Sequence, residues 1–147
     1  MSRLLERGKT PSRTTETTTI TIGDEYKDPV YPHTGNIESL QIFQAARADF
    51  LAKRGITPET LANQGLFPLM IQQVASYRGQ SYPGETVDIV TSLVPSRRKI
   101  VFYHEMRKGD QLVVEATCNY LLISSTGKPQ LIPTHLTRQL EQPTPRA

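Results

Sequence analysis

One long helical pattern precedes an unbroken series of strand patterns, and this order constrains the fold more than any other feature of the chain. Apolar residues recur at helical spacing after Asn36, and Gly55 ends the pattern directly after two basic residues. A lone helix ahead of several strands is typical of an α+β fold. The apolar arc is broad, so we expect a curved antiparallel sheet to wrap around a long central helix. The apolar positions are Leu40, Ile42, Phe43, Ala46, Phe50 and Leu51.

The rest of the chain predicts one domain. A β-branched strand is expected over 17–26, and a short helix with Thr57 as its cap follows the long one. A short last helix is expected after a Thr134 cap. Consecutive hairpins, one of them turning at Gly109-Asp110, would make the sheet antiparallel. We therefore predict a flexible leader at 1–16, a single domain at 17–141 and a frayed tail at 142–147. Period-two patterns cover residues 66–79, 85–94, 99–109 and 111–125.

Composition excludes several classes of function. The formal net charge is +3, and no predicted helix combines a basic face with interleaved aromatic residues, so we expect no nucleic-acid partner. No apolar run approaches the ~20 residues of a membrane span. The single cysteine, Cys118, cannot form an intrachain disulfide, and no His/Cys spacing typical of zinc is present. We predict a cytoplasmic protein with no metal and no cofactor.

Three segments, in order, resemble one known family. They are FQAARADFLAKRGI from residue 43, YRGQSYPGETVDIVTSL from residue 77 and STGKPQLIP from residue 125. Together they are similar to the 4-hydroxybenzoyl-CoA thioesterase family of hotdog-fold acyl-CoA thioesterases. The resemblance implies a hotdog fold, an acyl-CoA or acyl-carrier-protein substrate, and a homodimer or homotetramer. The matching positions of the first segment are Phe43, Ala46, Arg47, Phe50, Leu51 and Gly55.

The chain departs from that family at the catalytic position. The family carries an aspartate, followed three residues later by glycine, in the loop before the helix. Counting back from Arg47 places this aspartate at Pro29, whereas aligning the family's glycine with Gly35 places it at Pro32. Neither position holds a carboxylate, although Asp28 and His33 each lie one residue away from one of them.

The start of the long helix is the candidate catalytic site. Its free backbone N–H groups can stabilise the oxyanion that develops during attack on a thioester carbonyl. Glu38 in the first turn, His33 and Asp28 are the candidate bases. Each also has an ordinary structural role: Glu38 can favour the helix dipole, His33 can be a surface residue and Asp28 a turn residue. Asn36 either caps the helix or orients the carbonyl or water.

Four basic residues are candidate substrate-binding groups. Arg97, Arg98 and Lys99 form a cluster that suits the phosphates of CoA, or else a solvated hairpin tip. Arg47 lies within the apolar stripe, where its stem would pack on the core while its guanidinium finds a carboxylate or carbonyls. A direct ligand role for Arg47 is the alternative.

The sequence thus predicts a thioesterase whose substrate carbonyl is polarised by the start of the long helix. With the family aspartate missing, a protein that binds an acyl or aromatic ligand without cleaving it is the alternative. Hydrolysis of an unactivated ester, or dehydration of a β-hydroxyacyl group, is a third hypothesis, supported by fold analogy alone.

Overall fold

The computed structural model describes residues 13–143. The predicted leader and tail lie largely outside this range. The first strand begins at Thr14, earlier than the sequence indicated, so residues 14–16 belong to the sheet and not to the leader. The elements are β1 (Thr14–Thr21), a 3-10 turn (Asp24–Tyr26), α1 (Asn36–Ala52), α2 (Pro58–Ala62), β2 (Phe67–Tyr77), β3 (Thr86–Pro95), β4 (Ile100–Lys108), β5 (Gln111–Ile123), β6 (Pro129–Gln130) and α3 (Thr134–Leu140).

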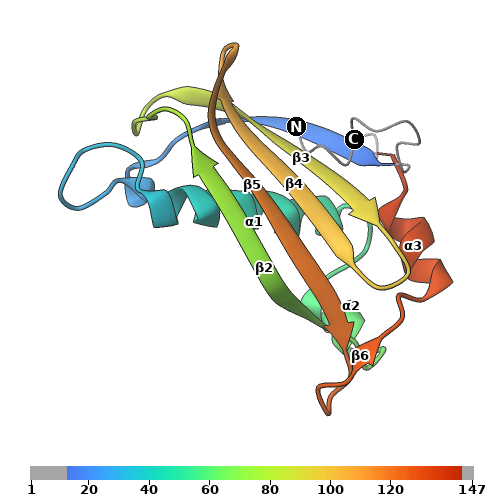
Figure 1. Cartoon of the computed structure of the whole chain (residues 1–147). Helices are drawn as coiled ribbons and strands as arrows, with labels where there is room; N and C mark the ends of the chain where they lie inside the picture. The colour runs from blue at the N-terminus through green and yellow to red at the C-terminus, as the bar shows by residue number, and fades with distance from the viewer. Residues whose placement is uncertain (1–12, 144–147) are drawn as a thin grey trace.

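The described strands form one antiparallel sheet in the order β1-β3-β4-β5-β2, with β6 paired to β5 (Figure 1). The expected hairpin at Gly109-Asp110 is confirmed between β4 and β5. The expectation of consecutive hairpins is wrong for β2, which pairs with β5 instead of β3. The connection from β2 to β3 therefore passes beyond β5 and β4, and β2 lies at the edge of the sheet opposite β1.

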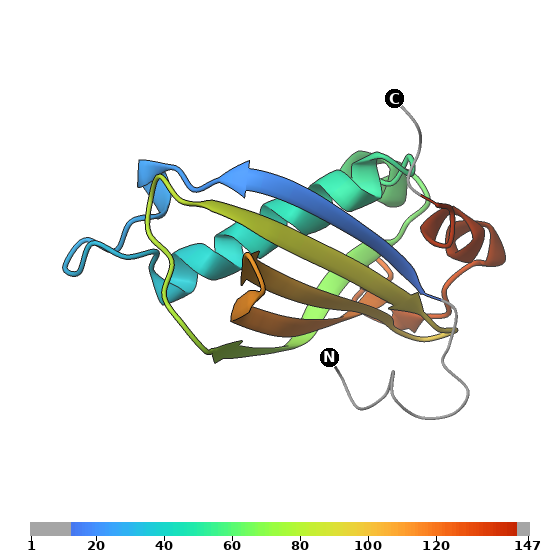
Figure 2. The same cartoon turned by 90° about the horizontal axis from the view of Figure 1, so that it is seen from above.

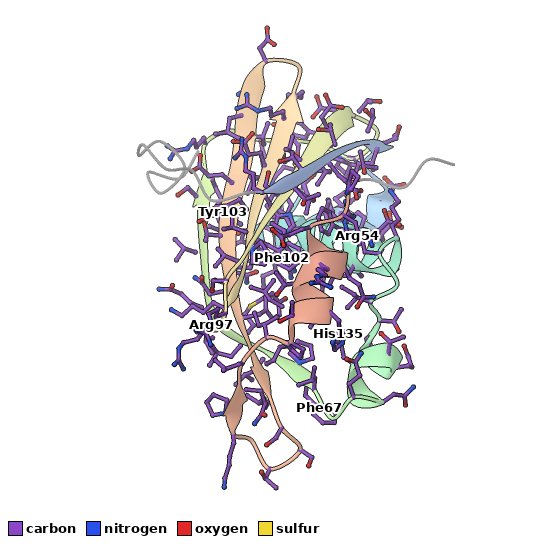
Figure 3. All side chains as sticks on the ribbon, turned by 90° about the vertical axis from the view of Figure 1, so that its right-hand side faces the viewer. Arg54, Phe67, Arg97, Phe102, Tyr103 and His135 are labelled. Carbon is purple, nitrogen blue, oxygen red and sulfur yellow. The ribbon has the colours of Figure 1, made fainter. Side chains whose placement is uncertain are left out.

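Helix α1 lies across one face of this sheet, and the strands twist around it (Figure 2). Its buried residues are Ser39, Ile42, Phe43, Arg47 and Phe50. Phe43 belongs to one apolar cluster and Phe50 to another, while the buried Arg47 lies between them in the sequence. A long helix wrapped by an antiparallel sheet in this strand order is the hotdog fold, as the resemblance implied. Phe102 of β4 lies in the interior between the sheet and the helix (Figure 3).

Backbone requirements explain most helix boundaries. Thr57 caps α2 through a reciprocal hydrogen-bond pair with Thr60, as predicted. Gly55 adopts a φ of 77°, which ends α1 without steric strain. Asn36 is not the cap of α1: Gly35 holds that position, and Asn36 is the first helical residue. Thr134 is likewise not the cap of α3: Pro133 holds that position, and Thr134 is the first helical residue.

A buried ion pair ties β1 to the end of α1. Arg54 is 3% exposed, and its Nη1 donates to the carboxylate of Glu16 and to the carbonyl of Phe50. Its Nε donates to the carbonyl of Gln142 at 3.0 Å. One guanidinium thus holds together β1, α1 and the segment after α3. Among residues 13–143, no helix has the length and apolar character needed to cross a bilayer.

Candidate active site at the start of helix α1

The loop before α1 is closed on itself and projects from the body of the molecule (Figure 1). Lys27 and Thr34 form an isolated bridge, and the N–H of Asp28 donates to the carbonyl of His33 at 2.8 Å. The N–H of Thr34 donates to the carbonyl of Ser81 at 2.7 Å, which joins the loop to the segment between β2 and β3. These bonds hold the loop and the first turn of α1 in a defined position relative to the sheet.

A cavity of about 600 Å³ lies at this junction. Its volume falls within the range of roughly 300–1,000 Å³ usual for small-molecule sites. The N–H groups of Asn36 and Glu38 have no acceptor among residues 13–143, and they carry the positive end of the helix dipole. This end of the cavity therefore favours a negatively charged or polarised oxygen. The lining residues are His33, Thr34, Asn36, Ser39, Tyr77, Gly79, Gln80, Ser81, Val113 and Val114.

Two buried polar atoms of residues that line the cavity lack hydrogen-bond partners within the described structure. They are His33 Nδ1 and Thr34 Oγ1, both sealed within the described structure. The ring of His33 packs edge-on against Tyr31, with 4.8 Å between the ring centroids. Because buried polar atoms are nearly always paired in folded proteins, these two atoms are exceptions within the described structure.

Three hydroxyl side chains of this cavity were missed by the sequence reasoning. Tyr77, at the end of β2, donates through its hydroxyl to the carbonyl of Asn36 at 2.8 Å. Ser39 is buried and donates through its hydroxyl to the carbonyl of Gly35 at 2.9 Å. Ser81 is buried in the segment after β2. A serine on the buried face of the helix was the one local signal, and only Ser39 carried it.

Asp28, a predicted base, serves as a turn residue in the described structure. Its Oδ1 accepts the N–H groups of Val30 at 2.8 Å and Tyr31 at 3.0 Å. The hydrogen bond from Tyr31, and next that from Val30, lowers the pKa of Asp28. A carboxylate stabilised in its ionised form is a weaker base, and Asp28 does not line the cavity.

Glu38 lies beside the cavity rather than in its wall. Its carboxylate folds back over the cap residue: a methyl group at Gly35 would lie 1.8 Å from Glu38 Oε1. Glycine is therefore required at position 35 for this arrangement of Glu38. Asn36 does line the cavity, and its Oδ1 accepts the N–H of Ile37 at 3.1 Å. Of the four predicted catalytic residues, the structure brings His33 and Asn36 together at the cavity, with Glu38 adjacent.

The basic candidates lie elsewhere in the protomer. Arg97, Arg98 and Lys99 are exposed between β3 and β4, and Arg97 is visible at the surface in Figure 3. The ten residues of β3, at ~3.3 Å each, separate this turn from the segment that contacts the start of α1. Within one protomer the cluster is therefore remote from the cavity at the start of α1.

Arg47 is 5% exposed and lies in the core. Its Nη1 lies 3.1 Å from Nε2 of His104 and donates to Sγ of Cys118 at 3.3 Å. The expectation of a carboxylate or carbonyl partner is thus wrong for the contacts of this side chain within residues 13–143. No group of three or more His, Cys, Asp or Glu side chains that could hold a metal occurs in the same range.

Comparison with known proteins agrees with this architecture. The model of the thioesterase-like superfamily matches residues 25–140. No curated protein sequence matches the chain. Two similar solved structures are a hypothetical protein from Aquifex aeolicus (18% identity, TM-score 0.76, covering 85% of this chain and 98% of that one) and a 1,4-dihydroxy-2-naphthoyl-CoA thioesterase from Synechocystis (14%, 0.74, 86% and 95%). A third is a 4-hydroxybenzoyl-CoA thioesterase variant in complex with 4-hydroxybenzoyl-CoA (17%, 0.74, 86% and 98%).

The structural similarities, all below 25% identity, define a hotdog-fold protein. The family match covers most of the chain and is more specific. The chain belongs to the thioesterase-like superfamily.

Proposed function

We propose that this protein hydrolyses an acyl thioester of CoA or of an acyl carrier protein. The observation that carries the proposal is the cavity at the start of α1, which is lined by His33 and Asn36 and lies where the first N–H groups of the helix are free. Family membership and the two similar CoA thioesterases support the same chemistry. Backbone donors at a helix N-terminus can stabilise the oxyanion that develops on a thioester carbonyl.

In the proposed reaction, the thioester carbonyl oxygen accepts hydrogen bonds from the N–H groups at the start of α1. His33 removes a proton from water as the water oxygen attacks the carbonyl carbon. The carbon–sulfur bond then breaks, and the sulfur leaves as a thiol after taking up a proton. The products are a carboxylic acid and CoA or the carrier-protein thiol. Glu38 is the alternative base, because its carboxylate lies against Gly35 at the same helix end.

We further propose that the active unit is a homodimer paired through β2. This strand has 11 residues and lies at the edge of the sheet, and a long apolar edge strand is a template for pairing with another chain. A homodimer built this way is symmetric, so its two β2 strands run antiparallel. Homotetramers would be pairs of such dimers. The exposed apolar residues of β2 are Phe67, Leu69, Ile71, Val74 and Tyr77.

The dimer would complete the binding site for CoA. Antiparallel pairing brings the Tyr77 end of one β2 next to the Phe67 end of the other. Phe67 pairs with the end of β5, and Ile100 at the start of β4 pairs with Tyr120 near the same end. In such a dimer the basic cluster at 97–99 would lie at the end of the sheet that approaches the partner's α1. In this arrangement it would bind the CoA phosphates for the partner's cavity.

Thiol release from a panel of acyl-CoAs tests the activity. Wild-type protein should release thiol well above buffer, and His33→Gln should reduce kcat by about 100-fold or more if His33 is the base. Glu38→Gln and Asp28→Asn test the alternatives in the same assay. His135→Gln is the matched control, because His135 lies on α3, contacts Gln64 and does not line the cavity. Full activity in all three variants would refute every assigned base.

A non-catalytic acyl-binding protein is the second candidate function. One observation favours it: the residues that line the cavity include no carboxylate. Calorimetric titration with a non-hydrolysable acyl-CoA thioether separates the two candidates. Saturable binding without thiol release from the corresponding thioester would support the binding protein, and turnover would exclude it.

A further inference from the structure

A second cavity, of about 450 Å³, lies at the other end of α1. It opens between α1, α2, α3 and the ends of β4 and β5, away from the candidate active site. Its wall is mostly apolar, with Phe102, Leu122 and Leu136 among the residues that form it. Arg47 is the one basic residue in this wall, and the one acidic residue, Glu59, belongs to α2, where it is exposed.

Arg47 brings an uncompensated positive charge to this cavity. No carboxylate within residues 13–143 forms an ion pair with it. His104 is stacked on Phe43, with ring centroids 4.9 Å apart and ring planes 9° apart, and burial, reinforced by the charge of Arg47, lowers the pKa of His104 to about 3. Burial raises the pKa of the Cys118 thiol. Near neutral pH the contacts of Nη1 are therefore with uncharged groups, and the guanidinium is a buried cation without a counter-ion.

The guanidinium of Arg47 has donors that are not engaged by protein groups of the described structure. Nη1 is the atom engaged by His104 and Cys118. Nε and Nη2 of Arg47 make no hydrogen bond within the described structure. Neither atom is among the fully buried side-chain atoms that lack a partner. Together, Nε–H and Nη2–H form the planar fork that binds both oxygens of a carboxylate. Arg47 is one of the residues that line the cavity, and the ring of Tyr120, another of them, has its centroid 5.7 Å from the guanidinium carbon.

We propose that this cavity binds an alkyl chain that ends in a carboxylate, with the carboxylate on the Nε–Nη2 fork of Arg47. The chain would lie against Phe102, Leu122 and Leu136, which remove it from water. An apolar chamber with one unpaired cation selects against neutral chains of the same length, because only an anion neutralises the buried charge. Two sources have this chemistry: a free fatty acid, and the acyl group of a dicarboxylic thioester. The second source rests on the proposed function.

Calorimetric titration with decanoate and with 1-decanol tests the site without requiring activity. We expect the wild-type protein to bind decanoate at least tenfold more tightly than decanol. Arg47→Met, which keeps an unbranched side chain and removes the charge, should lose this preference while decanol binding stays unchanged. Equal affinities in the wild type, or no binding of either compound, would overturn the proposal.

A second variant guards against a folding defect at Arg47. Ala48 is exposed and lines the cavity, so Ala48→Trp should fill it from the surface without touching the core. We expect this variant to lose decanoate binding with an unchanged circular dichroism spectrum. Retained wild-type affinity would show that decanoate binds elsewhere, and the proposed site would be wrong.

Turnover then separates the two sources of the ligand. Thiol release is compared for decanoyl-CoA and for decanedioyl-CoA, which has a carboxylate at the far end of the acyl chain. A preference for decanedioyl-CoA that disappears in Arg47→Met identifies the acyl group as the ligand. Decanoate binding without this preference identifies free fatty acid. If neither thioester is cleaved, the proposed function fails, and the decanoate titration still decides the site.

Discussion

His104 should make the stability of this protein depend on pH in a defined window. The side chain is 1% exposed between α1 and the sheet, and its Nδ1 lies 3.3 Å from Oγ1 of Thr91. Burial, and next the charge of Arg47, lowers its pKa from 6.5 to about 3. The unfolded chain takes up a proton at His104 as the pH falls below about 6.5, whereas the folded chain does not until about pH 3.

The sign and size of the effect follow from this difference. A proton that binds the unfolded state more tightly favours unfolding. The stability that the neutral His104 contributes is therefore fully present above about pH 7 and is lost as the pH falls. Each pH unit within the window costs about 1.4 kcal/mol. Between about pH 8 and about pH 5, His104 alone should therefore lower the free energy of unfolding by about 2 kcal/mol.

Urea unfolding at these two pH values, followed by circular dichroism, measures this loss in the wild type and in His104→Gln. Other titrating groups contribute to both proteins and cancel in the comparison. The wild type should lose about 2 kcal/mol more than the variant between the two pH values. An equal loss in both proteins would refute the view that His104 is buried and neutral. Nuclear magnetic resonance titration of the buried imidazole of His104 provides an independent check, since its signals should not shift above about pH 4.

Three further predictions concern stability, assembly and substrate binding. Glu16→Gln should lower the free energy of unfolding by about 3 kcal/mol in urea titrations, because Arg54 stays buried without its carboxylate, and adding Arg54→Met should recover part of the loss. If the proposed dimer forms, Leu69→Lys should convert it to a monomer in sedimentation-velocity experiments; a dimer that persists in this variant would exclude pairing through β2. Arg97→Ala combined with Arg98→Ala should raise KM for acyl-CoA and leave kcat unchanged, with no effect on an acyl-pantetheine that lacks phosphates.

Local patterns predicted most elements of the fold. The apolar stripe and Gly55 predicted α1 closely, because helical periodicity and a left-handed glycine are properties of a few adjacent residues. The same holds for the turn between β4 and β5. The pairing of β2 with β5 was not predicted, because alternation shows that a segment is a strand and does not identify its neighbour.

The candidate site also contains residues that the sequence predicted and residues that it did not. The start of a long helix indicated where a carbonyl would be polarised, and His33 and Asn36, adjacent to it in the chain, line the cavity. Tyr77 and Ser81 could not be predicted, since they reach the cavity only through the path of β2 and the connection that follows it.

Local patterns were enough to predict that one long helix is enclosed by strands, because periodicity and turn chemistry act over a few residues. Which residues contact the helix depended on the tertiary structure. It placed Arg47 of α1 against His104 of β4 and Cys118 of β5, residues 57 and 71 positions away in the chain. Which groups surround a buried charge depends on strand order, and strand order results from the packing of the whole chain.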